Sequence, residues 1–224
     1  MPTSRPRRIF VAGSTGATGR TLVRLATGVD VDIVPHLRPR TAEGRTLHPQ
    51  AAVLDLTDAP ALDAALTGCT TVLQLIGTMR KRFADGDTYE SSDIGTTRCL
   101  VESALRTGVD HLVLLSSVGA GKPRGAYLRA KATAEALVVD SGLDWTLVRP
   151  SAFDGEGHRP MPGLALLTGM LGLDRYRPIR IEQLAGALLH VASQGTARRQ
   201  VLEGASLWEQ VEAAGGSLHG TSSA

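Results

Sequence analysis

Near-continuous runs of apolar residues recur along the chain, and each is followed by a stretch with the spacing of a helix. The runs cover residues 8–13, 31–38, 51–56, 70–77, 109–117 and 143–150. Such runs are typical of strands covered on both faces, and strands that alternate with helices indicate parallel βαβ units. The pattern therefore predicts an α/β fold in three layers, with a doubly wound parallel sheet and six strands by residue 150.

One proline disagrees with this pattern. Pro35 falls inside the second run, which is an internal strand in a fold of this type. Because proline lacks the N–H that a sheet ladder needs, we expect a bulge or an early strand end there.

The pattern loosens after Pro150. Residues 151–178 are expected to form a substrate-side region, in which the apolar stretch PGLALLTGMLGL (162–173) would be a covering helix. Residues 179–195 then predict a strand followed by a helix.

The domain organisation follows from these segments. We expect residues 1–7 to be a flexible basic leader, 8–212 a single domain and 213–224 a disordered tail. Ser206 and Glu209 have the spacing of a capping box, which predicts the start of a last helix.

Composition narrows the functional classes. The chain has 224 residues, of which 42% are hydrophobic, and this suits one domain with a full core. A formal charge of +2 is too mild to indicate a nucleic-acid partner. No apolar run is long enough to span a bilayer and no signal peptide is visible, so we expect a cytoplasmic protein without a membrane partner. Neither the cysteines, Cys69 and Cys99, nor the histidines have metal-binding spacing, so no metal is expected.

A glycine-rich turn follows the first run, in the stretch VAGSTGATG. Gly13 permits a tight turn, Gly16 lets backbone N–H groups approach a pyrophosphate, and Gly19 allows a close helix. Such a turn can also bind nothing, but its place at the first strand–helix junction favours a dinucleotide site. The other turn residues expected to contact the nucleotide are Thr15, Ala17 and Thr18.

Basic residues indicate which dinucleotide is bound. Where an NAD-binding domain usually carries a carboxylate, this chain has Arg38 and Arg40, and Arg45 follows. Arginine pairs well with a ribose 2′-phosphate, so NADP(H) is favoured over NAD(H), with plain solvation of the arginines as the alternative. Further contacts to the nucleotide are expected at the ends of the third and fourth strands, from Asp55, Leu56, Ile76 and Gly77.

Tyr127 and Lys131 are four residues apart in a predicted helix, GAYLRAKATAEALV. Any helix places such residues on one face, so the pair alone is weak evidence of a site. However, Ser116 and Ser117 end the fifth run and Pro150 ends the sixth. Because active residues of parallel sheets lie at the carboxyl ends of the strands, these signals converge on one edge.

These side chains suit the reduction of a carbonyl group in a small molecule. A nicotinamide supplies a hydride, and a tyrosine hydroxyl supplies a proton. A tyrosine normally has a pKa of about 10, which a neighbouring ammonium lowers. Ser117 would orient the carbonyl oxygen, Tyr127 would donate the proton and Lys131 would supply the positive charge.

The motifs GSTGATG, LLSSVGA, YLRAK and LVRP resemble those of atypical short-chain dehydrogenases/reductases, similar to NmrA-like and Tat-interacting-protein-like members. The resemblance covers residues 8–195 and implies a seven-stranded or similar Rossmann sheet with a Ser–Tyr–Lys site. It also implies that Lys131 touches the nicotinamide ribose and that Pro150 lies against the nicotinamide. Asp93 occupies a position where many relatives carry Asn or Asp, and an N-cap is the preferred interpretation.

Two other functions stay open. NmrA-like relatives bind NADP as redox sensors without turnover, and typically lack the Tyr–Lys pair that this chain keeps. Some respiratory-complex relatives act as assembly partners. The sequence leaves open which of Ser116 and Ser117 faces the substrate, and whether the protein is a monomer or a homodimer.

Overall fold

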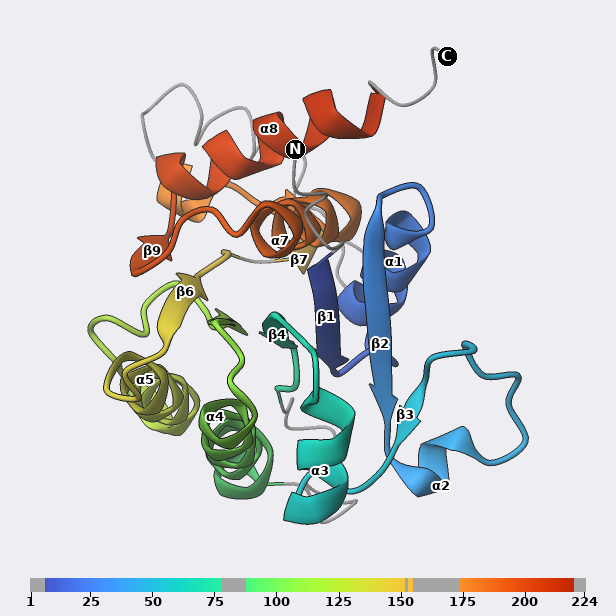
Figure 1. Ribbon diagram of the computed structural model, residues 1–224. Coiled ribbons are helices and arrows are strands. Elements are labelled where there is room, and N and C mark those ends of the chain that lie inside the picture. The colour runs from blue at the N-terminus through green and yellow to red at the C-terminus, as the bar shows by residue number, and fades with distance from the viewer. Residues whose placement is uncertain (1–6, 78–87, 152, 155–173, 220–224) are drawn as a thin grey trace.

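A parallel seven-stranded sheet forms the centre of the computed structural model, which describes residues 7–77, 88–151, 153–154 and 174–219 (Figure 1). The strand order is β3-β2-β1-β4-β5-β6-β9, and every neighbouring pair is parallel. The strands are β1 (Arg7–Ala12), β2 (Val31–Leu37), β3 (Ala52–Val53), β4 (Thr71–Gln74), β5 (His111–Leu115), β6 (Asp144–Val148) and β9 (Gln200–Leu202). The predicted doubly wound Rossmann-type fold is confirmed.

Helices cover both faces of the sheet (Figure 1). One face carries α1 (Ala17–Ala26) and α7 (Ile181–Gln194), on which α8 (Ala205–His219) packs. The other face carries α3 (Ala59–Leu66), α4 (Thr96–Thr107) and α5 (Gly125–Val139). Shorter elements are α2 (Pro39–Ala42), the π-helix η2 (Glu90–Gly95), the 3-10 helix η3 (Asp174–Tyr176), and the strand pair β7 (Phe153–Asp154) with β8 (Ile179–Arg180).

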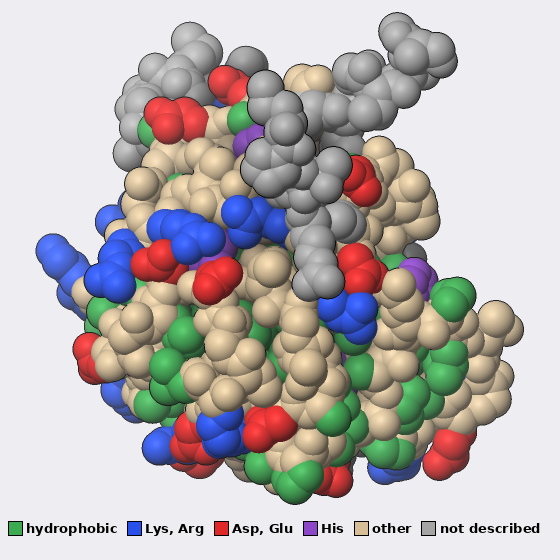
Figure 2. Space-filling view, viewed as in Figure 1, with side chains coloured by type: hydrophobic (Ala, Val, Ile, Leu, Met, Phe, Trp, Pro, Cys, Tyr) green, Lys and Arg blue, Asp and Glu red, His purple; other side chains and the backbone are tan. Residues whose placement is uncertain are grey.

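The apolar runs supply two cores at once. Val113 and Leu115 pack toward α7, whereas Leu112 and Leu114 pack toward α4 and α5. Successive side chains of a strand point to opposite faces, so a strand buried on both sides needs an unbroken apolar run. Outside these cores, acidic and basic side chains are interspersed over the face seen in Figure 2.

The expectation about Pro35 is wrong, because β2 continues through it in register with Val11 of β1. The carbonyl of Leu37 accepts from the N–H of Leu54, so the backbone polar groups of Leu37 face β3 and not β1. Residues two apart in a strand face the same neighbour, so the backbone nitrogen of Pro35 also faces the β3 side. On that side β3 begins only at Ala52, opposite His36. Because β3 has not yet begun opposite Pro35, no strand carbonyl there needs the N–H that proline lacks.

The end of the chain also differs from expectation. Helix α8 begins at Ala205, and the Ser206 hydroxyl accepts from the N–H of Glu203 rather than forming the predicted box with Glu209. The helix continues to His219, into the expected disordered tail, because Ala214 still packs in the interior at 4% exposure. The expected covering helix (162–173) lies outside the described residues. None of the described helices is both long and apolar enough to cross a membrane.

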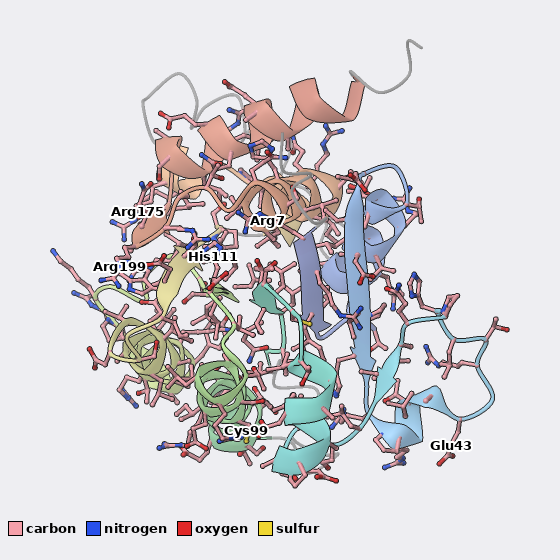
Figure 3. The ribbon with its side chains drawn as sticks, viewed as in Figure 1. Arg7, Glu43, Cys99, His111, Arg175 and Arg199 are labelled. Carbon is pink, nitrogen blue, oxygen red and sulfur yellow. The ribbon has the colours of Figure 1, made fainter. Side chains whose placement is uncertain are left out.

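His111 is buried at the amino end of β5 (Figure 3). Its Nε2 lies 2.8 Å from Thr146 Oγ1, which itself donates to the carbonyl of Ala197. Burial lowers the pKa of His111 to about 4, and the nearby Arg198 guanidinium contributes to this shift.

Acid should therefore destabilise the protein through His111. Between about pH 6.5 and pH 4, His111 is protonated in the unfolded chain but stays neutral in the folded chain. The free energy of unfolding therefore falls as the pH falls. From pH 7.5 to 4.5 we expect a loss of about 2.5 kcal/mol from this residue. Urea unfolding of the parent and of His111→Gln at both pH values measures it. The variant should lose less stability than the parent, and equal losses would contradict the assignment.

Candidate functional site

The glycine turn between β1 and α1 is tightly packed. Gly13 has a φ of +90°, and a Cβ there would lie 3.0 Å from the backbone nitrogen of Ile76. A Cβ on Gly19 would lie 2.2 Å from the carbonyl oxygen of Gly13 and 2.7 Å from the Cα of Ser14. Both positions therefore require glycine, as the sequence predicted.

The start of α1 fits an anion. Its N-cap is Gly16, no side chain caps the helix, and its first turn holds no acidic residue. Gly16 and Ala17 are exposed, whereas Thr15 and Thr18 are half-buried. Free N–H groups and the positive end of the helix dipole at an open turn are the features that bind a pyrophosphate.

The ends of β3 and β4 carry the other expected contacts. Asp55 is exposed, and its carboxylate accepts from the N–H and hydroxyl of Thr57 at 2.9 and 2.8 Å, which lowers its pKa. Leu56 points into the core, at 5% exposure. Ile76 is half-buried, and its N–H donates to the side chain of Gln74 at 3.0 Å.

A buried ion pair lies beside the end of β4. The Lys131 Nζ is 2.9 Å from Asp93 Oδ1, and the two side chains are only 6% and 1% exposed. Lys131 also donates to the carbonyl of Leu115 at 3.2 Å. A Cβ on Gly77 would lie 2.9 Å from this Nζ, so Gly77 leaves room for the ammonium.

Asp93 is not the N-cap that the sequence suggested, because the N-cap of α4 is Gly95. Asp93 lies in the π-helix η2, whose wider turn is a common feature of functional sites, and its side chain reaches Lys131 on α5. The sequence held one signal for this pair: a carboxylate just before one predicted helix and a lysine on the inner face of another.

Tyr127 lies one helical turn before Lys131 on α5, and its side chain is more open. It is 37% exposed, and its ring centroid is 5.8 Å from that of Tyr89, at the start of η2. Tyr127 and Lys131 are thus an exposed phenol and a buried ammonium, one helical turn apart on the same helix, as the spacing predicted.

The two serines after β5 differ in their surroundings. Ser116 is 3% exposed, and its hydroxyl has no hydrogen-bond partner among the described residues. Ser117 is half-buried, and its hydroxyl donates weakly, at 3.4 Å, to the carbonyl of Val118. The N–H of Val118 donates to the carbonyl of Pro150, which joins the ends of β5 and β6. The Ser117 hydroxyl is therefore the more accessible of the two, whereas the Ser116 hydroxyl is buried.

The arginines at the end of β2 are exposed. Arg38 is the N-cap of α2 and Arg40 lies within it. Arg38 lies close enough to His36 and Asp55 to lower the pKa of both groups, although burial is the main cause for His36 and hydrogen bonds to Thr57 for Asp55.

A cavity of about 210 Å³ lies beside the glycine turn. Ser14, Thr15, Arg20, Arg45 and His48 supply polar groups to its lining, and Val23, Pro35 and Leu37 are among its apolar lining residues. Arg38 is not among the residues that line it. The basic cluster in the sequence pointed to Arg45, but Arg20 was missed, because only the folded chain brings α1 against the loop that follows α2.

Comparison with known proteins places this chain among nucleotide-binding proteins. A family model described as NAD(P)H-binding matches residues 13–167. A (4-alkanoyl-5-oxo-2,5-dihydrofuran-3-yl)methyl phosphate reductase from Streptomyces griseus is 31% identical over 159 residues, which are 70% of this chain and 51% of the relative. Sterol demethylase protein B from Methylococcus capsulatus is 33% identical over 170 residues, 65% of this chain and 51% of the relative. The chain thus spans about half the length of these curated relatives.

Solved structures share the fold. An oxidoreductase, ylbE from Lactococcus lactis, superposes with a TM-score of 0.67 at 20% identity, over 92% of this chain and 95% of that one. An NADPH-dependent quinone oxidoreductase from Escherichia coli, complexed with NADPH, gives a TM-score of 0.62 at 20% identity, over 87% of this chain and 68% of that one.

Proposed function

Because this chain belongs to the NAD(P)H-binding family and has a Rossmann fold, we propose that it is an NADPH-dependent oxidoreductase of the atypical short-chain dehydrogenase/reductase type. It would reduce a small carbonyl-type substrate through Ser117, Tyr127 and Lys131. The observation that carries this proposal is the buried Lys131, held 2.9 Å from Asp93 and one turn below the exposed Tyr127.

Lys131 is held in a way that leaves part of it free to act. An ammonium has three N–H donors, and Lys131 donates to the carbonyl of Leu115 while its charge pairs with Asp93. This leaves donor capacity for a ligand at the sheet edge, where the family resemblance expects the nicotinamide ribose.

The proposed reaction assigns one step to each side chain. When bound, the nicotinamide supplies the hydride that adds to the carbonyl carbon. Ser117 donates a hydrogen bond that orients the carbonyl oxygen, and Tyr127 transfers its hydroxyl proton to that oxygen. Lys131, one turn away, places a positive charge beneath the phenolate that forms.

Features of the glycine turn and its surroundings support NADPH as the cofactor. Glycines at positions 13 and 19 and the uncapped start of α1 suit a pyrophosphate. Arg20 and Arg45 line the adjacent cavity, and Arg38 lies at the end of β2. Several guanidinium groups close to the expected ribose favour a 2′-phosphate.

The proposal is tested by steady-state oxidation of NADPH, followed at 340 nm, with aldehydes, quinones and flavins as acceptors. Binding of NADPH with turnover of one of these classes supports a reductase. Tight binding without turnover favours the redox-sensor alternative. Failure to bind either dinucleotide contradicts both.

Arg45→Ala and Arg38→Ala should each weaken NADPH binding selectively. Loss of one charge-assisted contact to the 2′-phosphate should raise the Kd for NADPH about tenfold and leave the Kd for NADH nearly unchanged. Titration of each variant with both dinucleotides measures the ratio, and Arg98→Ala, on the exposed side of α4, is the control. An equal loss for both dinucleotides would contradict a contact to the 2′-phosphate.

A further inference from the structure

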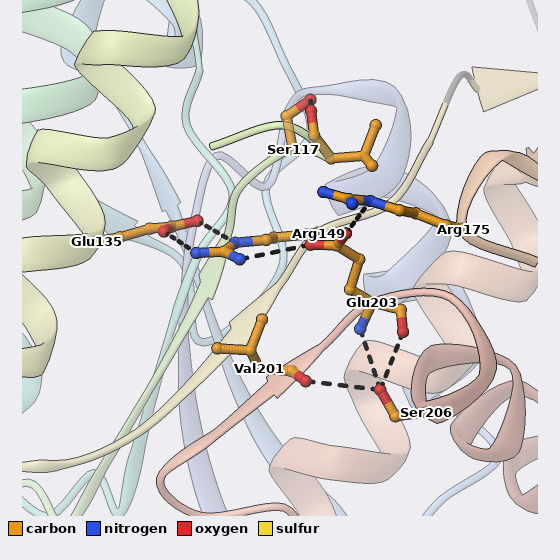
Figure 4. Close-up of polar contacts among 8 residues, drawn as sticks. Ser117, Glu135, Arg149, Arg175, Val201, Glu203 and Ser206 are labelled. Atoms are coloured by element: carbon orange, nitrogen blue, oxygen red, sulfur yellow. Dashed lines mark hydrogen bonds and ion pairs between the residues drawn. The ribbon is translucent and has the colours of Figure 1, made fainter. Parts of the chain in front are cut away.

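Arg149, directly after β6, forms a two-point ion pair with the helix that carries Tyr127 and Lys131 (Figure 4). Its Nε is 2.8 Å from Glu135 Oε1 and its Nη2 is 2.5 Å from Glu135 Oε2. The side chains are 16% and 7% exposed. A two-point pair fixes orientation as well as distance, and its burial limits screening by salt.

The same guanidinium also meets the carboxyl end of β9. Arg149 Nη1 lies 3.4 Å from Glu203 Oε2, and the other oxygen of Glu203 pairs with Arg175 of η3 (Figure 4). A Cβ on Gly121 would lie 2.9 Å from Arg149 Nη1, so the connection from β5 to α5 packs on this group. Arg149 is thus the centre of a cluster that joins α5, the ends of β6 and β9, and η3.

Charged groups are a large part of the inner face of α5. Its buried residues are Ala130, Lys131, Ala134, Glu135 and Val138. Two alanines and one valine supply little apolar area, whereas α7 buries Leu184, Leu188 and Leu189. The position of α5 therefore depends strongly on Lys131 and, one turn later on the same face, on Glu135.

We propose that Arg149 is a positioning residue, which sets the orientation of α5 at the sheet edge and thereby the places of Tyr127 and Lys131. Its role in the reaction rests on the proposed function. Lysine could keep the charge but not the two-point geometry, so Arg149→Lys should replace it only in part.

The test compares Arg149→Met and Arg149→Lys with Arg106→Met. Arg106 makes a two-point pair with Asp63, at 2.8 and 2.9 Å, which has the same geometry, is more exposed, and joins α3 and α4. In Arg149→Met, hydrogen exchange of the amides in α5 should accelerate at least about tenfold, because one buried charge loses its partner. Arg149→Lys should be intermediate, and Arg106→Met should leave α5 unchanged.

Turnover gives the second readout. With NADPH and 9,10-phenanthrenequinone as the probe, Arg149→Met should lower kcat at least about tenfold while the KM for NADPH changes less than about twofold. An α5 exchange rate and a kcat equal to those of Arg106→Met would overturn the proposal. If Arg149→Met does not fold, the α5 exchange rates and kcat values of Arg149→Lys and Glu135→Gln are compared with those of Arg106→Met instead. If the parent oxidises no NADPH with any carbonyl probe, the proposed function fails, and exchange in α5 alone decides whether Arg149 positions the helix.

Discussion

Tyr127→Phe should abolish NADPH oxidation and leave the Kd for NADPH nearly unchanged. The substitution removes only the hydroxyl, and the ring can keep its contact with Tyr89, 5.8 Å away between centroids. Because a positioned acid typically contributes about 10²- to 10⁴-fold to a rate, kcat should fall by a factor in that range. Stopped assays at saturating NADPH, with a parallel binding titration, measure the two effects separately.

Tyr89→Phe is the matched control for this experiment. It removes a hydroxyl from the neighbouring ring and should retain most of the turnover. Near-parental turnover by Tyr127→Phe would remove Tyr127 as the proton donor, whatever the effect of the control.

Asp93→Leu should be the most destabilising of these substitutions. Leucine keeps the branched shape of aspartate, although it is larger, and leaves the Lys131 ammonium, at 6% exposure, without its carboxylate. Breaking a buried pair by removing one partner costs about 3 to 5 kcal/mol, so the free energy of unfolding should fall by that amount. Urea unfolding at pH 7 measures it.

The double variant Asp93→Leu/Lys131→Met separates charge from packing. Removing both charges should recover much of the lost stability, since a buried pair is often replaceable by apolar residues, while turnover stays lost. A double variant no more stable than Asp93→Leu would show that the loss comes from the altered volume and not from the unpaired ammonium.

The sheet and the glycine turn were predictable because their signals are local. The apolar run 109–117 contains β5. The steric limit at Gly19 comes from Gly13 and Ser14, a few residues away, and Gly13 also meets Ile76, just after β4. The same holds for Tyr127 and Lys131, whose relation is fixed by one helix.

What could not be predicted depends on contacts distant in sequence. Pro35 is tolerated only because β3 begins late, which is a matter of register between two strands. Asp93 reaches Lys131 through a π-turn that no residue pattern announces. Arg20 joins the cavity only after α1 and the loop that follows α2 come together.

The weak apolar face of α5 has a practical consequence for anyone who transplants this site into another Rossmann scaffold. Moving Tyr127 and Lys131 alone would carry the reacting groups without their anchors. The graft has to include the acceptors for both buried charges, Asp93 for Lys131 and Arg149 for Glu135. The minimal portable unit is therefore a set of paired charges drawn from three separate segments, and not a four-residue spacing on one helix.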